Sequence, residues 1–454
     1  MLTLAKSSLQ QRFGSSVATF LNLFLGGAIL VGFASLYTTG SAAGLSSADQ
    51  GTLTTMSYVI GGWGLVIVVF GVSSALGLTT RQRSSELALL KSVGATPRQI
   101  GRLVRGETAL LCLLAIVPAV AVGYLAGLAM MTALKSTHQI ASDVHFKFGA
   151  YAIGSGLVDT FLAAFCASWY AARQATKLST AAAIAAAQLE QPKLSRKRLV
   201  FGLIFLVIGA DCGALTLTVL KNQGFTTMSV AGEGCIQSAI GFALLAPTLM
   251  RATARILGPT LAAFGGASGY LADKAVRQRS SQMAGLLMPV ILFVSLATGA
   301  LYIQIIMNDA DTLNHVTQSA DDKGVETLSF VIVGIIAVFA AVVVANIAIA
   351  TTLARTREFG RQRLIGLTPK QVSRTVRLET AVTIVAGIVF GTLSAAIGII
   401  PFSFAETHRA LPHISIGVYL GVVASALLIT FAATAGSARR ALRRPALEAA
   451  GRTE

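Results

Sequence analysis

The chain has 454 residues, of which 54% are hydrophobic and only 12% are charged, and its net charge is +17. This composition excludes a soluble globular protein and indicates a polytopic membrane protein. Nucleic-acid binding is not expected, because Lys and Arg stand between apolar runs without an accompanying aromatic and basic platform. The four cysteines lack metal-ligand spacing and no nucleophile stands with a base, so we expect neither a metal site nor an enzyme.

Ten apolar runs are long enough to cross a bilayer. Lys6 and Arg12 precede the first run, but that run is too long for a signal peptide, so we interpret it as a retained span. The sequence therefore predicts an all-α membrane protein with ten transmembrane helices. In chain order the runs cover approximately 17–39, 56–79, 107–131, 149–171, 199–220, 230–250, 284–307, 328–353, 378–402 and 414–436.

Basic residues alternate between the connections of these spans. If the N-terminus is inside the cell, the inner segments hold 31 Lys and Arg residues and the outer loops hold 5. Cytoplasmic segments of membrane proteins carry such an excess of positive charge. We therefore expect both termini in the cytoplasm and the chain in the plasma membrane as a multi-pass protein in contact with membrane lipids.

One cytoplasmic segment occurs twice, at 81–109 and at 353–381. The two copies align without a gap at an offset of 272, and twelve of their 29 positions are identical. An internal repeat of this kind indicates two copies of one structural unit. We predict two parallel four-helix units, with spans five and six as a joining pair, and domains at 1–176, 177–265 and 266–454.

The repeated segment has clear local signals. Leu87, Leu90 and Val93 recur at helical spacing and predict one apolar face of a short helix. Gly94 is suited to a left-handed cap that ends this helix, and Thr96 then begins a second helix with Pro and Gln at capping-box spacing. The second copy repeats these signals at Gly366, Pro369 and a second Thr and Gln pair, Thr368 and Gln371. A short helix held at the membrane surface is a suitable contact for a partner protein.

The residues from Glu86 to Thr96, with Gln99, Ile100 and Glu107, resemble the cytoplasmic signature of FtsX-like permease domains. These domains are the membrane half of MacB-type (type VII) ABC transporters. The second copy matches at Glu358, Gly366, Leu367, Thr368 and Gln371, with Phe359 and Gly360 where the first copy has Leu87 and Ala88. The arrangement of four, two and four spans also resembles the ten-span permeases of peptide-antibiotic resistance systems, without their large extracellular domain.

The resemblance implies that each short helix is a coupling helix seated in an ATPase subunit. No P-loop motif occurs in the chain, so it is expected to bind no cofactor, and ATP and Mg²⁺ belong to a separate polypeptide. Two coupling helices imply two ATPase copies for one permease chain. The residues expected at this contact are Glu86, Leu87, Leu90, Lys91 and Gly94 in the first copy, and Glu358, Phe359 and Gly366 in the second.

Other charged residues leave more than one interpretation open. Glu86 and Glu358 either contact the ATPase or favour the positive end of their own helices. Arg83, Arg102 and Arg105 anchor the chain at the inner face or bind the partner, and Glu107 and Glu379 stand at the membrane edge, placed to pair with such arginines. The acids within spans four and five, Asp159 and Asp211, either line a substrate path or face a polar crevice.

These patterns predict an ABC transporter permease that exports, or transmits force for, an amphipathic peptide, antibiotic or lipid. One alternative is a regulatory permease that transports nothing and activates a cell-wall hydrolase. The other is a secondary transporter that needs no ATPase and is driven by protons through Asp159 or Asp211.

Overall fold

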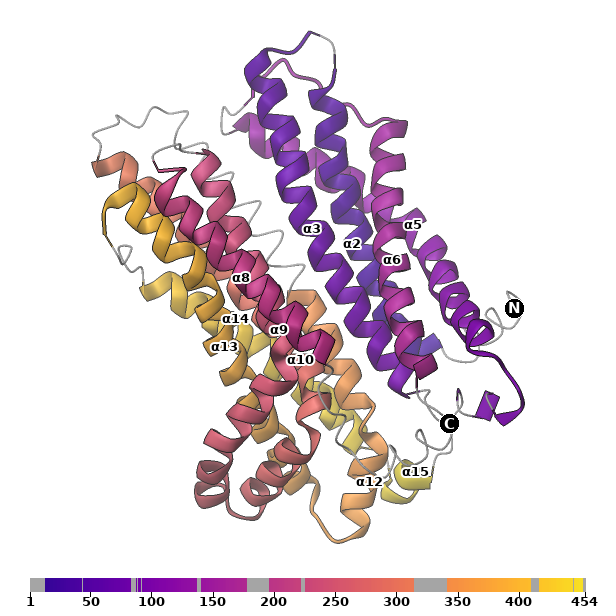
Figure 1. Cartoon of the computed structure of the whole chain (residues 1–454). Helices are drawn as coiled ribbons and strands as arrows, with labels where there is room; N and C mark the ends of the chain where they lie inside the picture. The colour runs from indigo at the N-terminus through magenta and orange to yellow at the C-terminus, as the bar shows by residue number, and fades with distance from the viewer. Residues whose placement is uncertain are drawn as a thin grey trace. The chain divides into compact units, whose positions relative to one another are not determined.

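The computed structural model describes residues 13–42, 44–82, 87, 89–90, 92–136, 140–177, 196–221, 225–313, 341–409, 416–443 and 445–451. Throughout these ranges the regular structure is helical and contains no strand. The helices form two compact units, one before residue 188 and one, among the described residues, after it. Figure 1 shows the helices of each unit with their labels.

The first unit is organised around one apolar helix. This helix, α2 (Phe13–Gly40), packs against α3 (Ser47–Gln82), α5 (Pro97–Ser136) and α6 (Ala150–Lys177). Val31 of α2 is almost fully buried, and its side chain lies against Gly123 of α5 and Gly156 of α6. Small residues at these positions let the helix backbones approach closely, as is common in membrane bundles.

The second unit is organised around α10 (Gly266–Leu313), which packs against α9 (Phe225–Phe264), α13 (Pro369–Thr407) and α14 (Ile416–Leu442). Val290 and Val294 of α10 lie against Gly387 and Gly391 of α13. The remaining helices are α8 (Arg196–Thr218), Ala341–Leu353, the short α12 (Thr356–Leu364) and α15 (Ala446–Gly451). The joining pair α8 and α9 packs on α10 and α13, within this unit.

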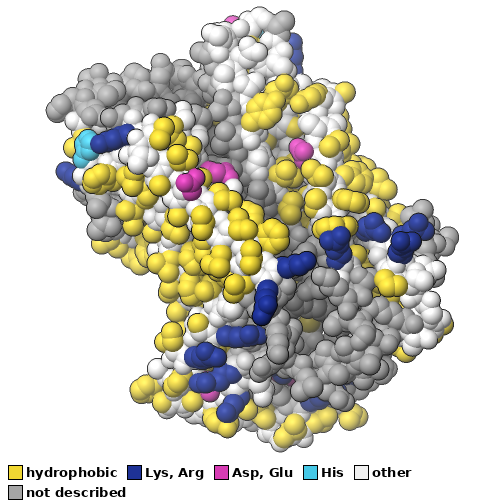
Figure 2. All heavy atoms as spheres, viewed as in Figure 1, with side chains coloured by type: hydrophobic (Ala, Val, Ile, Leu, Met, Phe, Trp, Pro, Cys, Tyr) yellow, Lys and Arg dark blue, Asp and Glu magenta, His cyan; other side chains and the backbone are white. Residues whose placement is uncertain are grey.

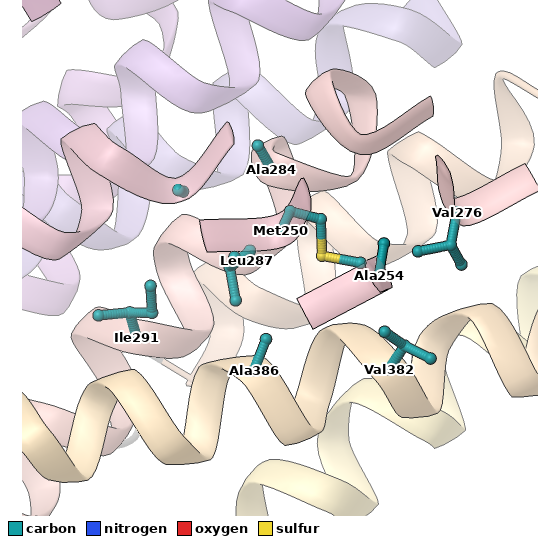
Figure 3. Close-up of a cluster of buried hydrophobic side chains, with 9 residues drawn as sticks. Met250, Ala254, Val276, Ala284, Leu287, Ile291, Val382 and Ala386 are labelled. Atoms are coloured by element: carbon teal, nitrogen blue, oxygen red, sulfur yellow. The ribbon is translucent and has the colours of Figure 1, made fainter. Parts of the chain in front are cut away.

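A core of small and aliphatic side chains joins α9, α10 and α13. It contains Met250 and Ala254 of α9, Leu287 and Ile291 of α10, and Val382 of α13, all almost completely buried. Figure 3 shows these side chains converging between the three helices. This core lies where the helices leave the predicted spans, so it links the predicted membrane part of the unit to the end beyond those spans.

In the part of the chain that the structure describes, eight helices are long and apolar enough to cross a membrane. They are α2, α5, α6, α8, α9, α10, α13 and α14, each overlapping a predicted span. The other two predicted spans fall on α3 and around Ala341–Leu353, and they remain predictions, as do the orientation of the termini and the three predicted domain boundaries.

The helix α8 has two distinct faces. Its buried residues are Gly202, Gly209, Gly213 and Thr216, whereas Phe201, Val207 and other large apolar residues are exposed. Glycines facing the bundle and aliphatic side chains facing outward are expected of a helix surrounded by lipid. Figure 2 shows hydrophobic side chains gathered over this part of the second unit, with Lys and Arg side chains of the same unit below them.

Candidate functional site

The two copies of the repeated segment end their short helices in the same way. Gly94 has φ 98° and Gly366 has φ 107°, which confirms the predicted left-handed turns. In the first copy the N–H of Ala95 donates to the carbonyl of Leu90 (2.9 Å), and in the second Leu367 donates to Gln362 (3.1 Å). These six-residue rings satisfy carbonyls that the helix end leaves without partners.

A capping box opens the following helix in both copies. The backbone N–H of Thr96 donates to Oε1 of Gln99 (2.7 Å), and the N–H of Gln99 donates to the hydroxyl of Thr96 (3.3 Å). Thr368 and Gln371 make the same reciprocal pair at 2.9 and 3.3 Å. The predicted caps are confirmed, so α5 and α13 begin at fixed positions directly after their turns.

An apolar side chain projects from each turn. Val93 is 87% exposed and Ile365 is 82% exposed, and each directly precedes its turn glycine. Leu87 and Phe359, which lie six residues before these exposed side chains, are buried instead. Leu87, Leu90 and Val93, predicted to share one apolar face, therefore differ in burial: Leu87 is buried, whereas Leu90 and Val93 are exposed.

Phe359 and Glu358 face the interior of the second unit. Phe359 lies in a cluster with Val372, Val376, Ala438 and Ala441, which holds α12 against α13 and α14. Nη1 of Arg363 also donates to the carbonyl of Leu442 at the end of α14 (3.1 Å). These two predicted contact residues therefore position α12, whereas Leu364, Ile365 and Gly366 at its end are exposed.

Four charged residues join α12 to its neighbours. Nε of Arg355 donates to Oε2 of Glu358 (3.1 Å), and its Nη2 donates to Oε1 of Glu379 on α13 (3.2 Å). Nη1 of Arg279 pairs with Oε2 of Glu358. Arg279 belongs to α10 and has non-helical backbone angles of −112° and 19°, so the pair reaches a kink in that helix. The cluster connects α10, α12 and α13.

Charge pairing outweighs burial at this cluster. Burial alone would raise the pKa of the Glu358 carboxyl, but Coulomb attraction and hydrogen bonds from Arg355 and then Arg279 hold it below its usual value. Burial would likewise lower the pKa of Arg355, and the attraction of Glu379 and Glu358 raises it instead. Glu358 and Arg355 are therefore ionised at neutral pH. The predicted pairing of Glu379 with an arginine is confirmed by its contact with Arg355.

The first copy is described in part. Glu86 and Lys91, two of the predicted contact residues, lie outside the described residues, and so does Arg83. Glu107, which matches Glu379 in the sequence, is buried and lines a small pocket together with Thr80, Leu87 and Thr108. Leu87 and Glu107 of the first copy therefore line the same pocket. Their counterparts in the second copy are Phe359 on α12 and Glu379 on α13.

The intramembrane acids occupy separate positions. Asp159 is half-buried on α6, and Asp211 is exposed on α8. The structure adds Glu233 of α9, whose Oε1 accepts a hydrogen bond from Nε2 of Gln237. Sequence reasoning missed Glu233, although an acid within the sixth predicted span was a signal for it. It also missed Val93 and Ile365 as exposed residues, and their equal spacing from the turn glycines was the signal there.

The comparison with protein-family models gives one result that covers much of the chain. The model described as FtsX-like permease C-terminal matches at two regions, 58–180 and 330–446, which together make up more than half of the sequence. A search of curated proteins found no match. The two matched regions each contain one copy of the repeated segment with its glycine turn and capping box. Proteins of this family are membrane permeases of the ABC-transporter type, and this chain belongs to the FtsX-like permease family.

Proposed function

We propose that this chain is the permease subunit of an ABC transporter whose ATP hydrolysis takes place in a separate ATPase subunit. The two exposed helix ends, at Val93 and at Ile365, are the seats for two copies of that ATPase. The transported or sensed molecule is an amphipathic peptide, antibiotic or lipid that reaches the protein from the membrane. The family supports a permease of this type, and the local geometry supports the seats.

The observation that carries the proposal is the match between the two helix ends. Both present a β-branched apolar residue to solvent, directly before a left-handed glycine and a capping box. An exposed apolar side chain on a rigid turn is a typical anchor for a protein partner, because burying it on binding is favourable while little conformational freedom is lost. Both side chains are more than 80% exposed in the described part of the chain, so packing there does not account for their apolar character.

The ion-pair cluster supports a path for force in the second unit. A load on the end of α12 reaches Glu358, which is paired with Arg279 at the kink of α10 and, through Arg355, with Glu379 of α13. Because α10 and α13 also share the core with α9, a displacement of α12 changes the arrangement of membrane helices rather than of α12 alone.

The test combines binding and activity. The full-length permease carrying Val93→Ser and Ile365→Ser together is expected to lose stable association with the ATPase that is produced with it, and to lose its stimulation of ATP hydrolysis. Val219→Ser is the matched control, because Val219 is also an exposed valine but follows α8 at the end expected outside the cell. ATPase association and stimulation that survive the double substitution would refute the proposed seats.

A further inference from the structure

Besides the proposed seat at Ile365, the second unit has another surface at the end expected in the cytoplasm. It lies outside the repeated segment. We infer that the hairpin between α9 and α10 is an additional docking point for the ATPase subunit seated on α12. This rests on the proposed function and goes beyond it, because α9 has no counterpart in the first four-helix unit. The hairpin end is Phe264, Gly265 and Gly266, with Tyr270 in the next turn of helix.

Backbone hydrogen bonds and close helix packing fix the shape of this hairpin. The N–H of Gly265 donates to the carbonyl of Leu261 (2.9 Å), and the N–H of Gly269 donates to the carbonyl of Gly265 (3.1 Å). A Cβ on Gly269 would lie 2.1 Å from the oxygen of Leu261, so the two helices meet too closely for any other residue. Gly266 has φ 59° and reverses the chain. Three glycines therefore specify this turn.

The end of this hairpin is apolar and exposed. Phe264 is 88% exposed, and Tyr270 and Ile256 are more than half exposed. The side chains of Arg255, Lys274 and Arg277 are exposed on the same hairpin, and Lys274 lies over the ring of Tyr270. Cations flanking an aromatic end are suited to a partner surface that is acidic around an apolar depression.

Lipid does not explain the exposure of Phe264. The sixth predicted span ends near Met250, and the part of α9 beyond it is about 21 Å long at 1.5 Å per residue. The hydrocarbon core of a bilayer is about 30 Å thick and is already crossed by the preceding turns of α9. Phe264 thus stands beyond the reach of the acyl chains, where a protein partner is the fitting occupant.

The hairpin is continuous with the α12 seat. The hydroxyl of Ser268 donates to the carbonyl of Gln371 (3.4 Å), and the hydroxyl of Thr375 donates to the carbonyl of Ser268 (3.5 Å). Gln371 is the capping-box residue that follows the Ile365 turn. In Figure 1 the α9–α10 hairpin and the connection from α12 to α13 both lie at the lower end of the second unit. A subunit seated on Ile365 therefore meets the hairpin as well.

The experiment places a photo-reactive amino acid at position 264, 365 or 219 of the full-length permease in cells that also produce the ATPase. Mass spectrometry identifies each adduct. We expect the same ABC ATPase polypeptide from positions 264 and 365, and none from the control position 219. The inference is overturned if position 365 gives the ATPase while position 264 gives lipid, a second copy of this chain or no adduct. That outcome leaves the proposed function standing. Absence of the ATPase from both positions refutes both.

A binding measurement tests whether the contact contributes affinity. Phe264→Ser in the full-length permease is expected to raise the Kd of the purified ATPase about tenfold, in the range of an interface anchor. Because the Phe264 side chain is 88% exposed, the substitution is expected to leave the thermal stability of the permease unchanged, which separates lost docking from lost folding. An unchanged Kd overturns the inference.

Discussion

Arg355 and Glu379 form a pair that joins the start of α12 to the part of α13 where its predicted span begins. Nη2 of Arg355 donates to Oε1 of Glu379 at 3.2 Å, and the Glu379 side chain is 2% exposed. The same guanidinium also holds Glu358, so one arginine bridges two carboxylates. A buried charge with a single bridging partner is sensitive to loss of either member, and this gives the first prediction.

Glu379→Gln is expected to destabilise the permease by about 3 kcal/mol, because it leaves Arg355 partly uncompensated in a buried position. The measurement is thermal or denaturant unfolding of the purified protein in detergent. Glu448→Gln is the matched control, since Glu448 is exposed on α15, and it should change stability by less than about 0.5 kcal/mol. Equal effects of the two substitutions would show that the pair contributes nothing.

The paired state of Glu358 predicts how stability depends on pH. Its pKa is lowered in the folded protein, so its contribution to stability is present above the ordinary carboxyl pKa of about 4.3 and is lost as pH falls through the folded value. The difference in Tm between the wild-type chain and Glu358→Gln should therefore stay constant at neutral and mildly acidic pH. It should shrink only below about pH 4. A difference that already closes near neutral pH contradicts the assignment.

The two turn glycines predict strain when they are replaced. Gly94→Ala and Gly366→Ala should each cost about 1–2 kcal/mol, because the left-handed backbone is unfavourable for a residue with a Cβ. Among the described residues, no neighbouring atom lies within 4 Å of a Cβ built at either position, so the cost comes from the backbone itself. Gly285→Ala, at an open position inside α10, is expected to be neutral or stabilising in the same unfolding assay. Equal stability of all three variants would exclude this conformational role.

A fourth prediction concerns the contact between α9 and α13. A Cβ on Gly398 would lie 2.4 Å from the carbonyl oxygen of Ala231 and 2.5 Å from Sγ of Cys235. Gly398→Ala should therefore destabilise the second unit by about 1–3 kcal/mol through overpacking. Gly421→Ala on α14 meets no atom within 4 Å and is the control. Similar Tm values for the two variants would mean that the helices can separate at no cost.

The local parts of the candidate site could be predicted from short stretches of sequence. The glycine turns and the capping boxes at Thr96 and Thr368 depend on residues three to five positions apart, and their hydrogen bonds form within those stretches. The burial of individual residues in the short helix could not be predicted in the same way. Periodicity alone placed Leu90 and Val93 with Leu87, but it does not show where a helix end leaves the body that it packs on.

The sequence by itself determined the membrane character, the repeat and the two glycine turns, because hydropathy, internal identity and turn chemistry are all properties of contiguous residues. Only the tertiary structure decided that Glu358 faces Arg279, that Arg355 faces Glu379, and that the α9–α10 hairpin lies against Gln371. Those contacts join segments far apart in the chain, and they form because helix packing brings the segments together at one end of the unit. No periodicity in a single segment specifies which distant charge will be its partner.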